Sequence, residues 1–275
     1  MGAVESIAEN LLAAGIGSGL VAGWRVARTR RGSKYTRAMW APFLNADSCI
    51  IEGTLSPAVL YETLPASVPP EKRDLVIELL PFIERHLADQ ESSGLMGRGD
   101  HEAIVRIQAG LARVGLRAVL PVKSADSLGE ERRKNLIVVG GPDVNSVTKD
   151  LLARLRCGVT VLQNDNNRNA VRDLVHGQNY LVASDATEIR DYGILVKAPS
   201  PYQEGRHVII TAGAHGYGCI AAGHLAVTAE RHMYRLSRDY PQGFECVVYH
   251  RRSRDSSNVA EENAIVLERP IGGGS

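Results

Sequence analysis

The sequence predicts an α/β domain with a Rossmann-like, mostly parallel sheet and helices on both faces, preceded by an N-terminal hydrophobic helix. From Asp47 onward, short β-rich runs alternate with helical stretches, which is typical of this layered class. Two of these runs pass through glycine-rich turns into helices. We therefore divide the chain into a hydrophobic helix (1–24), a basic linker (25–46) and the α/β domain (47–275).

The hydrophobic helix is predicted from the 15 residues Asn10–Trp24, which carry no charge and precede a basic cluster, Arg25–Arg37. Trp24 beside that cluster fits a membrane interface, with the positive side and the main domain in the cytoplasm and the basic residues against anionic lipid. Because 15 residues fall short of the ~20 that span a bilayer, a buried helix of a cytoplasmic protein is the alternative. A signal peptide is disfavoured, because Glu5 and Glu9 precede the apolar run.

Three glycines of this helix, Gly15, Gly19 and Gly23, lie four residues apart and so share one face. Each costs about 1 kcal/mol relative to alanine in a water-soluble helix, which close packing of two helices would offset. The spacing predicts a homo-oligomer through this face.

Composition narrows the class of protein. A chain of 275 residues with 44% hydrophobic and 23% charged residues is ordinary for a globular protein. A net charge of +1 gives no reason to expect a nucleic-acid partner. The cysteines are far apart, lack CxxC spacing and lie mostly in or beside apolar runs, which predicts reduced, buried thiols in the cytoplasm. They are Cys49, Cys157, Cys219 and Cys246.

The first half of the domain contains less distinct elements than the second. In order, we expect a strand at 48–53, a helix at 71–90, a glycine-rich turn at 93–100, a helix near 101–114 and a strand at 116–122. Pro81 predicts a kink in the first helix, and Asp100 is a candidate N-cap of the second.

The run NLIVVGGPDVNSVTKDLLARL combines a buried strand, a Gly140-Gly141-Pro142 break and a helix from about 145. A second such unit starts with a strand at 207–212 and passes through the turn 213–218 into a long helix. The remaining strand candidates are shorter or close the sheet, and the first three leave room for antiparallel pairing. They are 159–164, 180–184, 192–198, 244–250 and 263–270.

Both glycine-rich turns follow strands, at the edge where open α/β sheets bind ligands, and their amides are suited to an anion such as phosphate. The candidate ligand-binding residues are Gly140, Gly141, Asn145, Gly213, His215, Gly216, Tyr217 and Gly218. Simpler interpretations stay open: a sterically required turn at 140–142, helix capping by Asn145, and a His215 satisfied by a neighbouring carbonyl.

Three residues are candidates for catalysis. His215 is suited to acid–base chemistry near neutral pH. Glu52 lies in the apolar run CIIEG, and is either a buried functional carboxylate or a solvated residue past the strand. Asp191 precedes a strand and either faces the same edge or stabilises a turn.

Several motif classes are missing from the sequence. Neither turn matches GxGxxG with a later acidic residue, and GxxxxGK[ST], HExxH, paired CxxC and GxSxG do not occur. We therefore predict no metal site, dinucleotide dehydrogenase, P-loop NTPase or serine hydrolase. His215 followed by Cys246 loosely resembles a caspase-like pair, but Cys246 lies inside a strand without the expected glycine-rich surroundings.

The runs NLIVVGGPDVN, DYGILVKAPSPY and HVIITAGAHGYG resemble a group of uncharacterised prokaryotic proteins over roughly residues 135–225. The predicted helix, linker and domain together resemble membrane-tethered nucleotide-sensing or NAD-acting proteins of prokaryotic conflict systems, of the SLOG and TIR-like type. The SLOG signature GGxGT is replaced here by GAHGYGCIAA, so the resemblance is architectural and carries over no catalytic residue.

Three functions follow from these observations. The first is a membrane-anchored cytoplasmic module that binds a nucleotide-like or phosphorylated small molecule in signalling or defence. The second is an enzyme that cleaves the glycosidic bond of a nucleoside or NAD, with Glu52 or Asp191 as its carboxylate. The third is a soluble scaffold protein.

Overall fold

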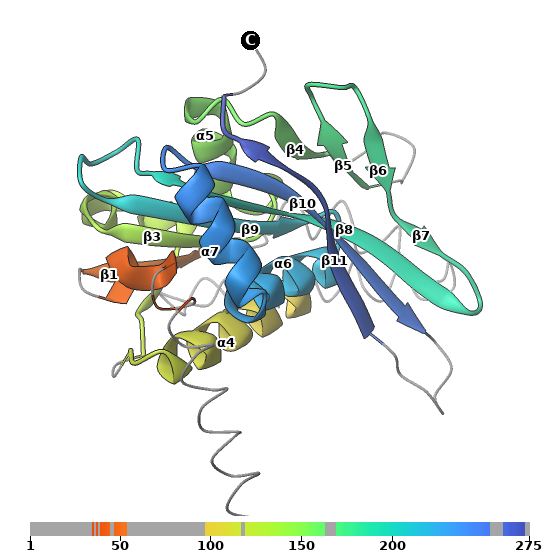
Figure 1. Ribbon diagram of the computed structural model, residues 1–275, viewed down its shortest axis with the longest axis horizontal. Coiled ribbons are helices and arrows are strands. Elements are labelled where there is room, and N and C mark those ends of the chain that lie inside the picture. The colour runs from red at the N-terminus through yellow and green to blue at the C-terminus, as the bar shows by residue number, and fades with distance from the viewer. Residues whose placement is uncertain are drawn as a thin grey trace, which may run out of the picture.

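The computed structural model describes residues 35, 37, 39–44, 47–53, 97–116, 119–162, 169–253 and 261–272 (Figure 1). The predicted hydrophobic helix, its three glycines, most of the basic linker and the helix at 71–90 lie outside these residues. Of the helices within them, none is long and apolar enough to cross a membrane.

A central sheet of eight strands organises the described part of the chain, in the order β11-β10-β8-β9-β3-β1-β2, with β7 beside β8. The pairs β1–β2, β1–β3 and β3–β9 are parallel, whereas β8 is antiparallel to β7, β9 and β10, and β11 to β10. All strands except β8 and β11 therefore run in one direction, so the mostly parallel sheet of the prediction is confirmed. The strands are β1 Ser48–Glu52, β2 Val122–Ser124, β3 Asn135–Val139, β7 Ala183–Ser184, β8 Glu188–Pro199, β9 His207–Gly213, β10 Phe244–Ser253 and β11 Glu261–Pro270.

The apolar side chains of the central strands contribute alternately to two separate hydrophobic cores, because successive side chains of a strand point to opposite faces of the sheet. Ile50, Ile137, Ile209 and Val248 face a core with helices α4, α6 and α7. Their neighbours in the strands face a second core with helix α5 and a small sheet, β4-β5-β6. Figure 1 shows α4, α6 and α7 on one side of the sheet and α5 with the small sheet on the other. The bounds are α4 Arg98–Arg113, α5 Ser146–Arg154, α6 Gly216–Thr228, α7 Glu230–Asp239, β4 Val159–Leu162, β5 Ala170–Asp173 and β6 Asn179–Leu181.

Most of the predicted elements that fall in the described residues are present, with three corrections. The strand expected at 116–122 begins only at Val122, after Pro121, which has no N–H to donate to a ladder. Asp100 is not the N-cap of α4: the helix starts at Arg98, with Gly97 before it. The long helix after β9 is interrupted at Ala229, whose ψ of 48° separates α6 from α7.

The small antiparallel sheet is the part that the sequence analysis misplaced. The runs at 159–164 and 180–184 contribute β4 and β6, but they pair with the unpredicted β5 rather than with the central sheet. Two further strand residues of the second run form β7 against β8. Such strands of two to four residues carry too little periodicity to assign them to a sheet.

Glycines allow α6 to approach both the sheet and α4. A Cβ on Gly218 would lie 2.1 Å from the carbonyl oxygen of Tyr192, and one on Gly193 would lie 2.3 Å from that of Gly218. In the same way, a Cβ on Gly99 would lie 2.2 Å from the Cα of Gly216. The first turns of α4 and α6 are therefore in backbone contact, directly beside the carboxyl end of β9.

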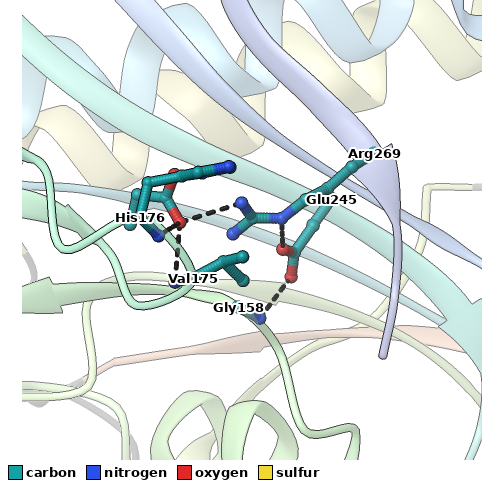
Figure 2. Close-up of polar contacts among 6 residues, drawn as sticks. Gly158, Val175, His176, Glu245 and Arg269 are labelled. Atoms are coloured by element: carbon teal, nitrogen blue, oxygen red, sulfur yellow. Dashed lines mark hydrogen bonds and ion pairs between the residues drawn. The ribbon is translucent and has the colours of Figure 1, made fainter. Parts of the chain in front are cut away.

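A buried ion cluster joins the small sheet to β10 and β11 (Figure 2). The Arg269 guanidinium pairs with the Glu245 carboxylate and lies 2.8 Å from an oxygen of Asp173. Glu245 also accepts the backbone N–H of Gly158 at 2.8 Å, and Asp173 accepts the ring Nδ1 of His176 at 2.7 Å. We call Asp173, Glu245 and Arg269, with these partners, the Arg269 cluster.

The last strand contains a bulge. Val247 pairs with Leu267, whereas the next residue, Val248, pairs with Ile265, so that Val266 has no partner on β10. Among the described strands, β11 is the outermost at its end of the sheet.

Candidate functional site

A cavity of about 580 Å³ lies at the carboxyl ends of β9 and β10, beside the first turns of α4 and α6 and the β7–β8 hairpin. Its apolar wall includes Val182, Ile189 and Ile220. The charged and aromatic side chains along it are Arg98, Glu102, Asp191, His215, Tyr217 and Arg252. Its size and mixed lining are those of a small-molecule site.

Asp191 is fully buried on β8 at the base of the cavity. One carboxylate oxygen accepts the backbone N–H groups of Tyr192 at 2.7 Å and His215 at 3.2 Å, and the other accepts that of Gly218 at 2.6 Å. Burial raises the pKa of Asp191, although these amides and His215 favour its ionised form. The side chain thus occupies the N-terminus of α6, where an anion would otherwise bind.

A polar row crosses the sheet next to Asp191. The strand register places Asp191 opposite His250, and His250 opposite Asn263, which holds the ring Nδ1 at 2.8 Å. His250 is 1% exposed, and its Nε2 has no hydrogen-bond partner among the described residues. The Tyr217 ring stacks on the imidazole of His250, with centroids 5.3 Å apart and planes inclined by 3°.

The Arg252 side chain is oriented by the same stack. Its guanidinium carbon lies 5.5 Å from the Tyr217 ring centroid, and Nη1 donates to the phenol oxygen at 3.4 Å. The carboxylate of Glu261 is 3.9 Å from this guanidinium. A planar guanidinium held in this way presents a fork of donors that matches a phosphate or carboxylate.

The opposite wall of the cavity comes from α4. Arg98, its first residue, is exposed and makes no ion pair within the described chain. One turn later, Glu102 holds Arg106 through a single oxygen, Oε1, which accepts Nε at 3.1 Å. Arg106 also lies 3.9 Å from Glu261, so a chain of ion pairs connects α4 to the strand that supports Arg252.

The positive charge of the cavity comes from arginine side chains rather than from helix termini. Helix N-termini carry about half a positive charge each, and two of them meet here. Asp191, however, occupies the end of α6, and Asp100 lies in the first turn of α4, where burial raises its pKa. The full positive charges along the cavity are therefore those of Arg98 and Arg252.

The cavity brings together part of the predicted site. Asp191, His215, Gly216 and Tyr217 line it. Nδ1 of His215 accepts a hydrogen bond from the side-chain amide of Asn169 at 3.4 Å, because an amide nitrogen can only donate. Gly213 and Gly218 lie behind this wall: their lack of a Cβ permits the close approach of β9, β8 and α6.

Gly140, Gly141 and Asn145, the candidates from the first glycine-rich turn, are not among the described residues that line the cavity. Gly140 has a φ of +110°, which glycine adopts without strain, and Gly141 accepts the backbone N–H groups of Val144 and Asn145. Asn145 is fully buried and caps α5, accepting the N–H groups of Val147 and Thr148 at 3.0 and 3.2 Å. Its amide nitrogen donates to carbonyls of β1 and β3. The capping interpretation of Asn145 is thus the one that the structure supports.

Glu52 is the last residue of β1 and is half-buried, but it is not among the described residues that line the cavity. Burial raises its pKa, which His101 opposes and Asp100 reinforces. Its position is intermediate between the buried and the solvated alternatives.

The thiols are free and buried, as the sequence predicts. Cys246 faces the core shared with α4 and α6, and burial raises the pKa of its thiol well above the usual range. It lies near the start of β10, whereas the cavity lies at the end of that strand. The geometry gives no support to a Cys246–His215 protease pair. No group of three or more metal-ligating side chains is found in the described part of the chain.

Sequence reasoning missed Arg98, Glu102, His250 and Arg252. Arg98 and Glu102 lie one turn apart at the start of a helix whose beginning was placed too late. His250 and Arg252 end a strand that runs parallel to β9, so their chain position indicates the same edge of the sheet. Their position at the carboxyl end of a predicted strand was the signal in the sequence that could have identified His250 and Arg252.

Comparisons of the chain with protein-family models, with curated proteins and with solved structures find no match.

Proposed function

We propose that the cavity binds a small anionic ligand with a phosphate group, such as a nucleotide-like molecule, and that this binding is the function of the domain. The observation that carries the proposal is the pair Arg98 and Arg252, which lie on different elements along one cavity of about 580 Å³. Guanidinium groups are suited to phosphate because their parallel N–H donors match its oxygens.

Two features support binding over bond cleavage. Both carboxylate oxygens of Asp191 are engaged by backbone amides, which leaves this group poorly placed to act as a base or nucleophile. Glu52, the other candidate carboxylate, is not among the described residues around the cavity. Cleavage of a glycosidic bond, attachment to a membrane, and a role in signalling or defence stay predictions from the sequence.

The test is a titration of the full-length chain with inorganic phosphate, AMP and NAD by calorimetry, repeated with Arg252→Gln. We expect the substitution to weaken phosphate and AMP by about 10- to 100-fold, since a charge-assisted hydrogen bond contributes roughly 1.5–3 kcal/mol. Arg172→Gln is the matched control: Arg172 is an exposed arginine of β5 outside the cavity lining.

The outcomes separate clearly. Weaker binding in Arg252→Gln with unchanged binding in Arg172→Gln supports the cavity as the site. Absence of binding by all three ligands, or equal losses in both variants, would exclude the proposed function. Analysis of the same mixtures for free adenine or nicotinamide tests the hydrolase prediction.

A further inference from the structure

The charges along the cavity restrict the kind of phosphate ligand that it accepts. Arg98 and Arg252 supply two positive charges, whereas the negative charge of Glu102 on the same lining is already paired with Arg106. Asp191 adds a second carboxylate at the base. A ligand with two or three consecutive phosphates would bring more negative charge than the two arginines offset. The balance favours a ligand with a single phosphate.

Glu102 also has an oxygen available for a ligand. Its Oε1 accepts the hydrogen bonds from Arg106, whereas Oε2 has no hydrogen bond or ion pair within the described residues. The side chain is 40% exposed, and Arg106 is held in turn by Glu261. The carboxylate is therefore fixed in orientation along the cavity, and can only accept hydrogen bonds when ionised.

From these observations we infer that the ligand is a sugar monophosphate, whose phosphate binds Arg98 and Arg252 and whose vicinal hydroxyl groups donate to Glu102. This inference rests on the proposed function and adds the chemistry of the second half of the ligand. A free sugar phosphate and a nucleoside monophosphate share that chemistry. The wall of Val182, Ile189 and Ile220 lies in the same cavity and is suited to the less polar part of either molecule.

The role of Glu102 would be to discriminate between ligands rather than to provide overall affinity. A site that accepts hydrogen bonds from hydroxyl groups discriminates against analogues that lack them, because Oε2 of Glu102 then loses contact with water and gains no hydrogen bond from the ligand. The requirement for vicinal hydroxyls should therefore depend on Glu102, whereas the requirement for phosphate should depend on Arg252.

The experiment measures dissociation constants of ribose 5-phosphate, 2-deoxyribose 5-phosphate, AMP and inorganic phosphate with the full-length chain. We expect ribose 5-phosphate to bind at least about tenfold more tightly than its 2-deoxy analogue. Glu102→Gln and Glu102→Ala should reduce that ratio below about threefold without weakening inorganic phosphate. Glu130→Gln, at an exposed glutamate of the segment Gly129–Arg133, is the control that should leave the ratio unchanged.

Each result has one interpretation. Equal affinity for the two sugars, with phosphate binding still dependent on Arg252, would overturn the inference and leave the proposed function standing. Loss of phosphate binding from both Glu102 variants would also overturn it, since Glu102 would then be needed for the fold of the site. A failure of every probe to bind would instead remove the proposed function. If the inference holds, tighter binding of AMP than of ribose 5-phosphate assigns the nucleotide as the source of the sugar phosphate.

Discussion

Two buried aspartates lie at opposite sides of the central sheet and differ in how their charge is stabilised. Asp173 belongs to the Arg269 cluster and is paired with a full positive charge at 2.8 Å. Asp191 lies at the base of the cavity and is held by backbone amides of α6 and its own strand. Both have no solvent exposure, yet they differ in what surrounds them.

The pKa values of the two carboxyl groups move in opposite directions. Burial alone would raise the pKa of Asp173, but hydrogen bonds from His176, Arg269 and two backbone amides lower it to about 2. For Asp191, burial outweighs the amides and the pKa is raised. A buried carboxylate is therefore not by itself the mark of a site: in the Arg269 cluster the carboxylates are paired with an arginine of the fold, whereas in the cavity Asp191 is held by backbone amides and the arginines lie on the lining.

The largest effect on stability is expected from the loss of Arg269. Arg269→Met leaves Asp173 and Glu245 buried without their cation, and we expect the free energy of unfolding to fall by about 3–5 kcal/mol. Urea denaturation measures it, and Arg172→Met on the same small sheet should change it by less than about 0.5 kcal/mol. A loss below about 1 kcal/mol would show that the cluster contributes little.

The two aspartates should respond oppositely to pH. Asp173 has a lowered pKa, so its contribution to stability is present above about pH 4 and is lost as the pH falls through about 2. Asp173→Asn should therefore cost about 2–3 kcal/mol near pH 6, and progressively less toward pH 2.

For Asp191 the sign is reversed. A carboxyl group with a raised pKa stabilises the fold most when it is protonated, and this contribution declines as the pH rises from about 4 through the folded-state pKa. The destabilisation by Asp191→Asn should thus decrease with rising pH. Urea denaturation of the two variants and the wild type between pH 2.5 and 7 tests both signs, and parallel curves would contradict the comparison.

The contact between α4 and α6 tests the geometry of the cavity. A Cβ in Gly99→Ala would meet the backbone of Gly216 at 2.2 Å, and we expect a loss of about 1–3 kcal/mol in stability together with weaker phosphate binding. Gly216→Ala is the matched variant, since its Cβ would lie 3.1 Å from Gly99 and alanine favours the helix by about 1 kcal/mol. Thermal unfolding should rank Gly99→Ala as the less stable; the reverse order would exclude the described contact.

The smallest effect is expected at the ring that orients Arg252. Tyr217→Leu removes the stack beneath the guanidinium and should weaken phosphate binding by about two- to fivefold, the equivalent of 0.5–1 kcal/mol. Tyr217→Phe keeps the ring and should bind phosphate within about twofold of the wild type. Calorimetry distinguishes the two, and equal losses would assign the effect to the hydroxyl group instead.

Local signals in the sequence account for the two clearest strand–turn–helix units. Short, mainly apolar runs followed by glycine predict β3 and β9, and Asn145 is recognisable as a cap because its side chain acts within three residues. His215 and Tyr217 were predicted as ligand-binding residues for the same reason: they directly follow a strand, at the edge where open α/β sheets bind ligands.

The rest depends on contacts between residues far apart in the chain. Asp191 meets His250 only through the register of β8 and β10, and Arg269 meets Asp173 only because a small sheet packs on the larger one. Neither the register between two strands nor the packing of short strands on another sheet can be predicted from the hydrophobic periodicity of a single segment. The GGP turn was overvalued because the same glycine pattern serves close packing and anion binding alike.

The bulge at Val266 has a consequence for the behaviour of the protein at high concentration. A regular strand of ten residues at a sheet edge offers a template on which other chains can add and grow into aggregates. The extra residue breaks that template near its middle, Pro270 ends it without a donor, and Glu261 and Glu262 place like charges at its start. Deletion of Val266 would restore a continuous ladder, and with it a tendency to form ordered aggregates.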